Sequence, residues 1–235
     1  MSEGARTFVD ALYPFLQAPS ARSVDAPVAL LDAVRRSTLD KCADVVALRR
    51  EMIAEYATAL PTAADAMAAR FARGARLFAF GNGGSATDAD DAAADCMNPW
   101  RAEWRTLPAM SLPADGATFS AVSNDVGVEH VFVRQLAALG EKNDIALGIS
   151  TSGQAPNVIA GLRAARRRGM LTVALTGNDG GAIAGDSCAD FCFVARRDFV
   201  PRIQEGHATL WHTLLTLVQA ELRDPTVMAA MENHA

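Results

Sequence analysis

Cysteine is scarce in this chain. Its 235 residues include 4 cysteines, Cys42, Cys96, Cys188 and Cys192, which are scattered along the sequence. Cys188 and Cys192 have no second pair with which to form a zinc knuckle. A chain of this length buries enough surface to fold without disulfides, so we expect reduced, mostly buried thiols in a cytoplasmic protein.

Long apolar runs and an excess of positive charge are also missing. No run approaches the roughly 18 residues that a membrane span needs, and the N-terminal residues, with Glu3 and Asp10, lack the apolar core of a secretory signal. The net charge is −5, which argues against a nucleic-acid-binding surface. No repeat or low-complexity tract occurs. We therefore expect a globular protein without membrane or direct nucleic-acid contacts.

Short apolar segments alternate with helical patterns from residue 76 onward. They predict strands at 76–80, 109–112, 144–149, 171–175 and 191–194, and helices at 85–97, 117–122, 129–139, 156–168 and 201–222. This alternation indicates an α/β fold with a doubly wound, mostly parallel five-stranded sheet covered on both faces. Ligands of such sheets bind outside the carboxyl ends of the strands, where the strand order reverses.

Helical patterns also precede the first strand. Residues 1–27 form an N-terminal arm with a short helical candidate at 8–16, and residues 28–235 form the main domain. Within that domain a helix at about 28–60 is followed by another that starts at Pro61 and stops at Gly74. These extra N-terminal helices, within 28–74, either pair with another subunit or cover the sheet.

A glycine-rich turn follows the first predicted strand. Gly81, Asn82, Gly83, Gly84 and Ser85 lie between that strand and the next helix. The free N–H groups at the start of the helix suit an anion. A merely tight turn is the alternative. We also expect a capping box between Ser85 and the residue three positions on, Asp88.

A second loop, after the third strand, is rich in hydroxyl groups. Ser150, Thr151 and Ser152 precede a glycine and a helix that begins at Pro156. Hydroxyl donors and helix N–H groups together can bind phosphate oxygens without a lysine, whereas helix capping would need only one hydroxyl. The turn at 175–181 looks structural, because Asn, Asp and Gly supply positive φ angles.

Three carboxylates lie on one face of the helix at 85–97. Asp88, Asp91 and Asp95 are three and four residues apart, which indicates either a cation or basic partner, or a solvated acidic face. Gln204 and His212, eight residues apart on the last helix, could complete an oxygen and nitrogen metal site with Asp91 and Asp95.

Other readings of this region stay open. His212 could instead act as a general acid/base opposite a carboxylate, and Arg101 or Arg105 could pair with the acidic face. His207 is expected to be a packed histidine. The loop at 98–107, with Trp100 and Trp104, is either a surface loop or gates the substrate.

Five motifs occur in an order that resembles a known family. They are Gly81-Asn82-Gly83-Gly84-Ser85, Ser123-Asn124-Asp125, Gly148-Ile149-Ser150-Thr151-Ser152-Gly153, Ala174-Leu175-Thr176-Gly177 and Arg202-Ile203-Gln204-Glu205-Gly206-His207. Over about residues 30–222 the chain resembles the sugar isomerase (SIS) fold, which is flavodoxin-like, and within it the phosphoheptose isomerases. The resemblance implies a homotetramer with zinc that converts sedoheptulose 7-phosphate to D-glycero-D-manno-heptose 7-phosphate.

The resemblance also implies roles for individual residues. The substrate-binding residues would be Asn82, Gly83, Gly84, Ser85, Asn124, Asp125, Ser150, Thr151, Ser152 and Gln204, with the phosphate on 150–152. The metal ligands would be Asp91, Asp95, Gln204 and His212. Asp95 and His212 would be the catalytic pair.

Four positions depart from the family pattern. Asp91 replaces a metal-binding histidine, Asp95 replaces a catalytic glutamate, Ala155 replaces a serine of the phosphate loop and Pro99 replaces an arginine. These departures leave a second hypothesis open, a non-catalytic SIS adaptor like the DnaA initiator-associating protein DiaA. A sugar-phosphate sensor is a third.

Overall fold

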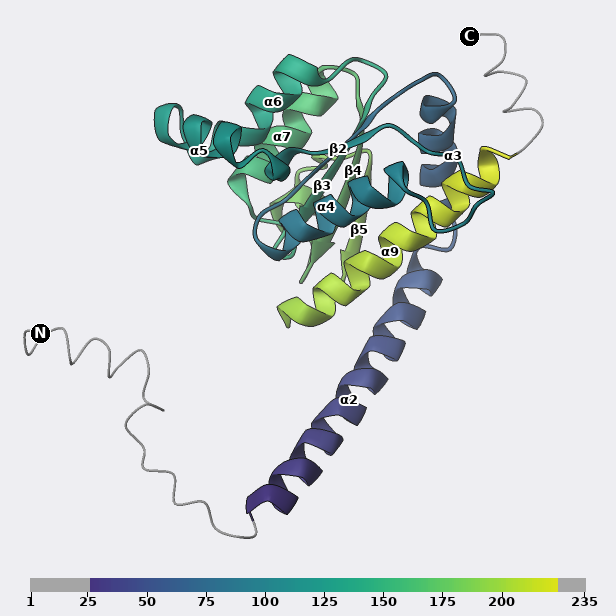
Figure 1. Ribbon diagram of the computed structural model, residues 1–235, viewed down its shortest axis with the longest axis vertical. Helices are drawn as coiled ribbons and strands as arrows, with labels where there is room; N and C mark the ends of the chain where they lie inside the picture. Colours follow the sequence, from purple (N-terminus) through teal and green to yellow (C-terminus); the bar gives the residue numbers. More distant parts are fainter. Residues whose placement is uncertain (1–25, 224–235) are drawn as a thin grey trace, which may run out of the picture. The chain divides into compact units, whose positions relative to one another are not determined.

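The computed structural model describes residues 26–223, with side chains from residue 29 onward (Figure 1). The chain divides into two units, 1–44 and 45–235, which are described separately. Helix α2 (Ala26–Glu55) crosses this boundary. The predicted N-terminal arm and the helix at 8–16 lie outside the described residues. In the range 26–223, no helix has the length and apolarity to cross a membrane.

The larger unit is built on five parallel strands in the order β2-β1-β3-β4-β5. The strands are β1 (Leu77–Phe80), β2 (Ala109–Ser111), β3 (Ile145–Ser150), β4 (Leu171–Gly177) and β5 (Phe191–Ala195). The chain leaves β1 toward β2 on one side and returns to β3 on the other, so the strand order reverses between β1 and β3. This confirms the predicted fold class and puts the ligand-binding edge at the ends of β1 and β3.

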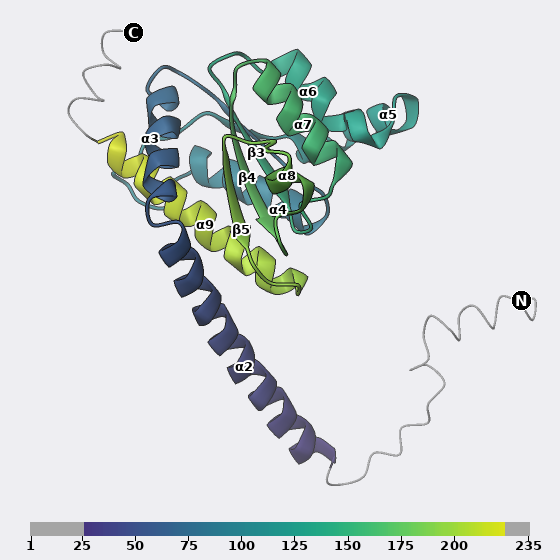
Figure 2. The ribbon, with the colours of Figure 1, turned by 180° about the vertical axis from the view of Figure 1, so that it is seen from behind.

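Helices cover both faces of the sheet (Figures 1 and 2). On one face lie α3 (Ala59–Phe71), α4 (Gly84–Met97) and α9 (Val200–Glu221); on the other lie α6 (Val131–Leu139) and α7 (Pro156–Arg167). Alternate residues of a strand pack against the two helix layers. Leu77 packs in the core beside α3, α4 and α9, and Phe78 packs in the core beside α6 and α7. Burial on both faces explains why the strands read as continuous apolar runs.

The N-terminal helices differ in detail from the prediction. The break falls at residues 56–58, and α3 begins before Pro61 rather than at it. Pro61 fits the first turn, where its missing N–H would have no intrahelical partner. Of the two alternatives, α3 covers the sheet, because Ala64, Met67 and Phe71 are buried in the core beside α4 and α9.

Several short helices were predicted incompletely or not at all. Helix α5 (Gly116–Asp125) is longer than expected at both ends. The Asp115 side chain caps its start and accepts a hydrogen bond from the Thr118 N–H at 3.0 Å. The turn at 175–181 has the expected positive φ at Asn178 and Gly180. It leads into an unpredicted five-residue helix, α8 (Gly181–Gly185). The short 3-10 helices η2 (Leu112–Ala114) and η3 (Val128–His130) flank α5.

Candidate active site

The glycine-rich turn joins the end of β1 to the start of α4. Gly83 is the N-cap, with a φ of +56° that favours glycine. The predicted capping box between Ser85 and Asp88 is wrong, because α4 begins one residue earlier and no side chain caps it. Gly84 is needed for a close approach: a Cβ there would lie 2.2 Å from the Gln204 Nε2. The Gln204 side chain of α9 therefore rests on this turn.

An amide pair ties the glycine turn to the start of α7. The Asn82 Nδ2 donates to the Asn157 Oδ1, and the Asn157 Nδ2 donates back to the Asn82 Oδ1, both at 2.8 Å. Asn157 is buried and was not among the residues predicted from the sequence. The pair fixes the two loops to each other at the edge where β1 and β3 end.

The hydroxyl-rich loop leads from β3 to α7. Ser150 is buried, Thr151 is half-buried and Ser152 is exposed. The Ser152 hydroxyl accepts a hydrogen bond from the Gln154 N–H at 3.2 Å. The N-cap of α7 is Ala155, without a side-chain capping bond, so capping does not explain the three hydroxyls.

The acidic face of α4 packs against α9. The His212 Nε2 lies 3.7 Å from the Asp95 Oδ2, so the structure brings the predicted catalytic pair together within one chain. The Asp95 side chain is 14% exposed and the His212 side chain 51% exposed. The Asp95 carboxylate and the more exposed His212 imidazole can exchange protons with a ligand that lies beside both.

Two tryptophans hold the Asp95 carboxylate. The Trp211 Nε1 donates to Oδ2 at 3.0 Å, and the Trp100 Nε1 donates to Oδ1 at 2.9 Å. The Trp100 ring also stands edge-on to His212, with 4.7 Å between ring centroids. The Arg101 guanidinium, one of the two predicted partners of the acidic face, lies over the Trp104 ring.

A second carboxylate and imidazole, those of Asp88 and His207, face each other between α4 and α9. The His207 Nε2 lies 2.9 Å from the Thr176 carbonyl oxygen, which can only accept, so Nε2 carries the proton and Nδ1 is an acceptor. That Nδ1 lies 4.0 Å from the Asp88 Oδ2. Within the described part of the chain, both buried atoms lack a hydrogen-bond partner.

Burial shifts the titration of both groups. It lowers the pKa of His207 to about 4. It raises the pKa of the Asp88 carboxyl to about 6. The hydrogen bond from the Gln204 side chain lowers this pKa, and the negative charge of Asp91 raises it slightly. His207 is a packed histidine, as predicted, but it faces the site.

These groups line a small cavity of about 80 Å³. Its wall includes Asp88, Asp91, His207, Trp211 and His212. A shallower hollow of about 430 Å³ on α9 shares His212 and is lined by Arg49, Thr209 and Thr213. The cavity alone is smaller than the roughly 300 Å³ or more that small-molecule sites occupy, so a sugar phosphate would extend into open space beyond it.

The predicted metal ligands do not form a compact donor set. Among residues 29–223, no group of three or more His, Cys, Asp or Glu side chains is arranged to hold a metal ion. Asp91 and His212 both line the cavity, whereas both oxygens of Asp95 accept indole hydrogens. The residues present therefore do not fit a zinc ion in this arrangement.

Asn124 and Asp125 stand apart from this group. They end α5, which packs against α6 and η3, and both are exposed. The Asn124 Nδ2 donates to the Asp125 Oδ1 at 2.7 Å. In the described region, no hydrogen bond or ion pair joins them to the two loops.

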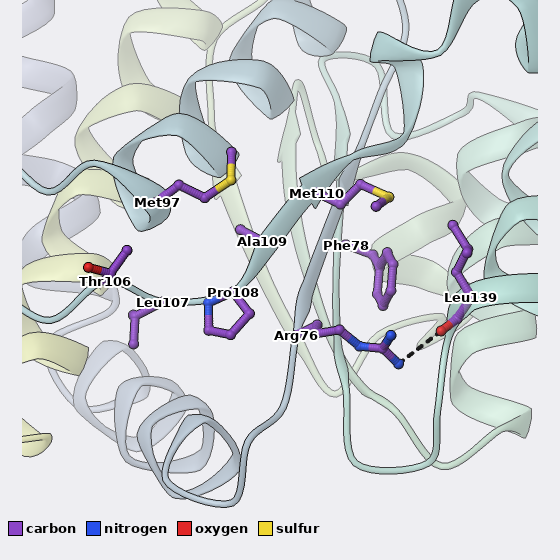
Figure 3. Close-up of a pocket in the computed structure, with 9 residues that line it drawn as sticks. All are labelled: Arg76, Phe78, Met97, Thr106, Leu107, Pro108, Ala109, Met110 and Leu139. Atoms are coloured by element: carbon purple, nitrogen blue, oxygen red, sulfur yellow. Dashed lines mark hydrogen bonds between the residues drawn. The ribbon is translucent and has the colours of Figure 1, made fainter.

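An apolar groove lies at the opposite edge of the sheet, where β1 and β2 begin (Figure 3). Its volume is about 350 Å³, and Phe78, Met97, Met110 and Leu139 line it. The Arg76 Nη2 at its side donates to the Leu139 carbonyl at 2.9 Å. It contains no group of the candidate site, so it does not contribute to that site.

Sequence comparison identifies relatives of this chain. Residues 42–177 match the SIS domain family. Phosphoheptose isomerase from Desulfovibrio desulfuricans is 43% identical over 192 residues, covering 82% of this chain and 90% of the relative. The enzyme of the same name from Solidesulfovibrio magneticus is 40% identical over 175 residues, covering 74% of this chain and 84% of the relative.

Solved structures agree with these relatives. Phosphoheptose isomerase from Neisseria gonorrhoeae has a TM-score of 0.72 at 32% identity, covering 80% of this chain and 99% of that one. The Francisella tularensis enzyme has a TM-score of 0.67 at 32% identity, covering 78% and 98%. With this fold, these motifs in order and relatives matched over most of their length, the chain belongs to the phosphoheptose isomerase family of SIS-domain proteins.

Proposed function

We propose that the protein is an aldose–ketose isomerase of a phosphorylated sugar, with sedoheptulose 7-phosphate as the substrate and D-glycero-D-manno-heptose 7-phosphate as the product. The observation that carries this proposal is the approach of His212 to Asp95, at 3.7 Å, beside the ends of β1 and β3. The family relationship supplies the substrate.

The two loops would bind the sugar phosphate. Ser150, Thr151 and Ser152, with the N-terminus of α7, offer hydroxyl and N–H donors to the phosphate. The glycine turn offers backbone N–H groups to the sugar, with the Asn82 amide held in place by Asn157. Asn124 and Asp125 would reach sugar hydroxyls only if the ligand extends to the end of α5.

The chemistry moves two protons, one between carbons and one between oxygens. Asp95 removes a proton from the carbon next to the carbonyl, which gives an enediol, and returns the proton to the neighbouring carbon. His212 gives a proton to the carbonyl oxygen and takes one from the adjacent hydroxyl. The number of protons on the sugar is unchanged, as isomerisation requires. Because the present donor set does not fit zinc, no step depends on a metal.

A homotetramer is part of this proposal. The monomer cavity of about 80 Å³ is too small for the substrate, and Val46 and Ile53 of α2 are exposed apolar residues. A second copy could both cover these residues and enclose the substrate. Light scattering after gel filtration tests the assembly.

One observation supports the adaptor or sensor hypothesis. Asp95 takes the place of the family's catalytic glutamate, and its carboxylate accepts two indole hydrogens. Incubation with sedoheptulose 7-phosphate, followed by NMR or chromatography of the products, separates the hypotheses. Formation of the aldose supports the isomerase. Binding of the sugar phosphate without turnover supports the sensor, and neither binding nor turnover supports the adaptor.

A further inference from the structure

The environment of Asp95 suggests what organises the catalytic pair. Each of its two oxygens accepts one indole N–H, from Trp100 and Trp211. Trp211 is 4% exposed on α9, so its indole is fixed by the core. Trp100 is 51% exposed in the loop after α4. A buried and an open indole therefore hold one carboxylate from two sides.

The two indole bonds leave Asp95 able to accept a proton from the substrate. A carboxylate oxygen has two lone pairs, so each oxygen keeps one for a substrate hydrogen. The same Trp100 ring meets the His212 ring edge-on, at 85° between planes. Trp100 thus touches both members of the pair and fixes their relative orientation.

A metal ion at Asp95 would need further ligands, because the lone pair that remains on an Asp95 oxygen supplies only one of them. Among the described side chains, no group of three or more His, Cys, Asp or Glu is arranged to hold a metal ion.

We propose that Trp100 and Trp211 are positioning residues that hold the Asp95 carboxylate between two N–H donors, in the place of a bound metal ion. The catalytic consequence rests on the proposed isomerase function, whereas the hydrogen bonds and the lack of a metal-binding donor set do not. Donors that are already in place cost no reorganisation when the proton moves.

Indole NMR tests the hydrogen bonds without any assay of activity. The chain has 3 tryptophans, so protein labelled with ¹⁵N-tryptophan gives three indole N–H resonances, assigned with Trp100→Phe and Trp104→Phe. In Asp95→Ala the resonances of Trp100 and Trp211 should move upfield and that of Trp104 should stay. Unmoved Trp100 and Trp211 resonances, in a variant whose remaining spectrum is native, would overturn the proposal.

Zinc titration tests whether the site at Asp95 lacks a metal-binding donor set. Calorimetry with zinc chloride at micromolar protein should show no stoichiometric binding that depends on Asp95, and the three indole resonances should keep their positions. One zinc ion bound per chain, lost in Asp95→Ala and accompanied by movement of the Trp100 and Trp211 resonances, would overturn the proposal.

Kinetics test the positioning role. Trp100→Phe keeps the ring against His212 and removes the N–H, and should lower kcat about 10- to 100-fold with KM changed less than about twofold. The Trp104 ring centroid lies 5.5 Å from the Trp100 ring centroid. Trp104→Phe, the control in the same loop, keeps a ring at this contact and should therefore keep wild-type kcat. Unchanged kcat in Trp100→Phe would contradict the positioning role. If the wild-type protein turns over no sugar, the proposed function fails, while the NMR and zinc results still decide the indole arrangement.

Discussion

Asp95 is shorter by one methylene than the glutamate that the family resemblance implies, and the structure shows what surrounds it. Two indoles reach the carboxylate on α4, and His212 approaches from α9. The shorter side chain is therefore held in place rather than left unsupported. Its role in proton transfer is the most direct test of the proposed chemistry.

We expect Asp95→Asn to lower kcat about 10²- to 10⁴-fold, because an amide cannot remove a proton from carbon and its NH2 group cannot accept the second indole hydrogen. Steady-state kinetics with sedoheptulose 7-phosphate measure this loss. Asp90→Asn is the control, since Asp90 is exposed on the same helix and bonds the Ser111 hydroxyl instead. Equal losses in the two variants would indicate damage to α4 rather than loss of a base.

At the scale of the elements, the site depends on how the two loops are attached to each other. The reciprocal amide bonds between Asn82 and Asn157 connect the turn after β1 to the helix after β3. Each amide satisfies the other, so removing one leaves a polar group without its partner.

Asn157→Ala should lower the free energy of unfolding by about 1–3 kcal/mol, because it removes both amide bonds and the bond that the Asn157 Oδ1 accepts from the Val158 N–H. Urea unfolding measures this cost. Because the two side chains share both bonds, the double variant Asn82→Ala/Asn157→Ala should be more stable than the sum of the two single losses predicts. Strictly additive losses would contradict the pairing.

Gly84 makes a second connection, between the glycine turn and α9. In Gly84→Ala the new Cβ would displace the Gln204 amide, which a Cβ at this position would meet at 2.2 Å. We expect a loss in kcat/KM of about tenfold or more, since misplacement by about 1 Å can cost roughly 10²-fold in rate.

Gly116→Ala is the matched control for this change. Gly116 is also the first residue of its helix, and a Cβ there meets nothing within 4 Å. The control should keep wild-type kinetics and gain about 0.4–1 kcal/mol of stability, because alanine restricts the unfolded chain. A similar kinetic loss in both variants would exclude the Gln204 contact as the cause.

The sequence predicts most of the elements because their signals are local. Apolar runs, glycines and prolines locate the five strands and the larger helices, and the spacing of Asp88, Asp91 and Asp95 places them on one face. The Trp211 bond to Asp95 and the partner of Asn82 are not local. They depend on how α4, α7 and α9 pack, and no spacing within one helix indicates them. A polar Asn157 directly after Pro156 was the only visible signal of the amide pair.

At the scale of the whole molecule, two buried titratable groups tie stability to pH in opposite directions. In the unfolded chain, His207 would titrate near its ordinary pKa of 6.5, and in the folded protein near 4. Between these values the unfolded state binds more protons, so acid favours unfolding. His207 alone lowers the free energy of unfolding by on the order of 3 kcal/mol between neutral pH and pH 4. The Asp88 pKa rises from 3.8 to about 6 on folding. Between those values the folded state binds more protons, so acid favours folding.

The two variants that remove these groups should therefore change the pH dependence in opposite senses. Asp88→Asn should lose stability more steeply than the wild type as the pH falls from 7 to 5, because the compensating proton uptake is gone. His207→Gln should lose stability less steeply, because no buried imidazole has to become charged. Urea unfolding at pH 7, 6 and 5, at one protein concentration, measures the three slopes. Since Asp88 and His207 lie 4.0 Å apart in the same cavity wall, a general disturbance of packing would shift both variants alike. Slopes that change in the same direction would therefore assign the acid sensitivity to groups other than this pair.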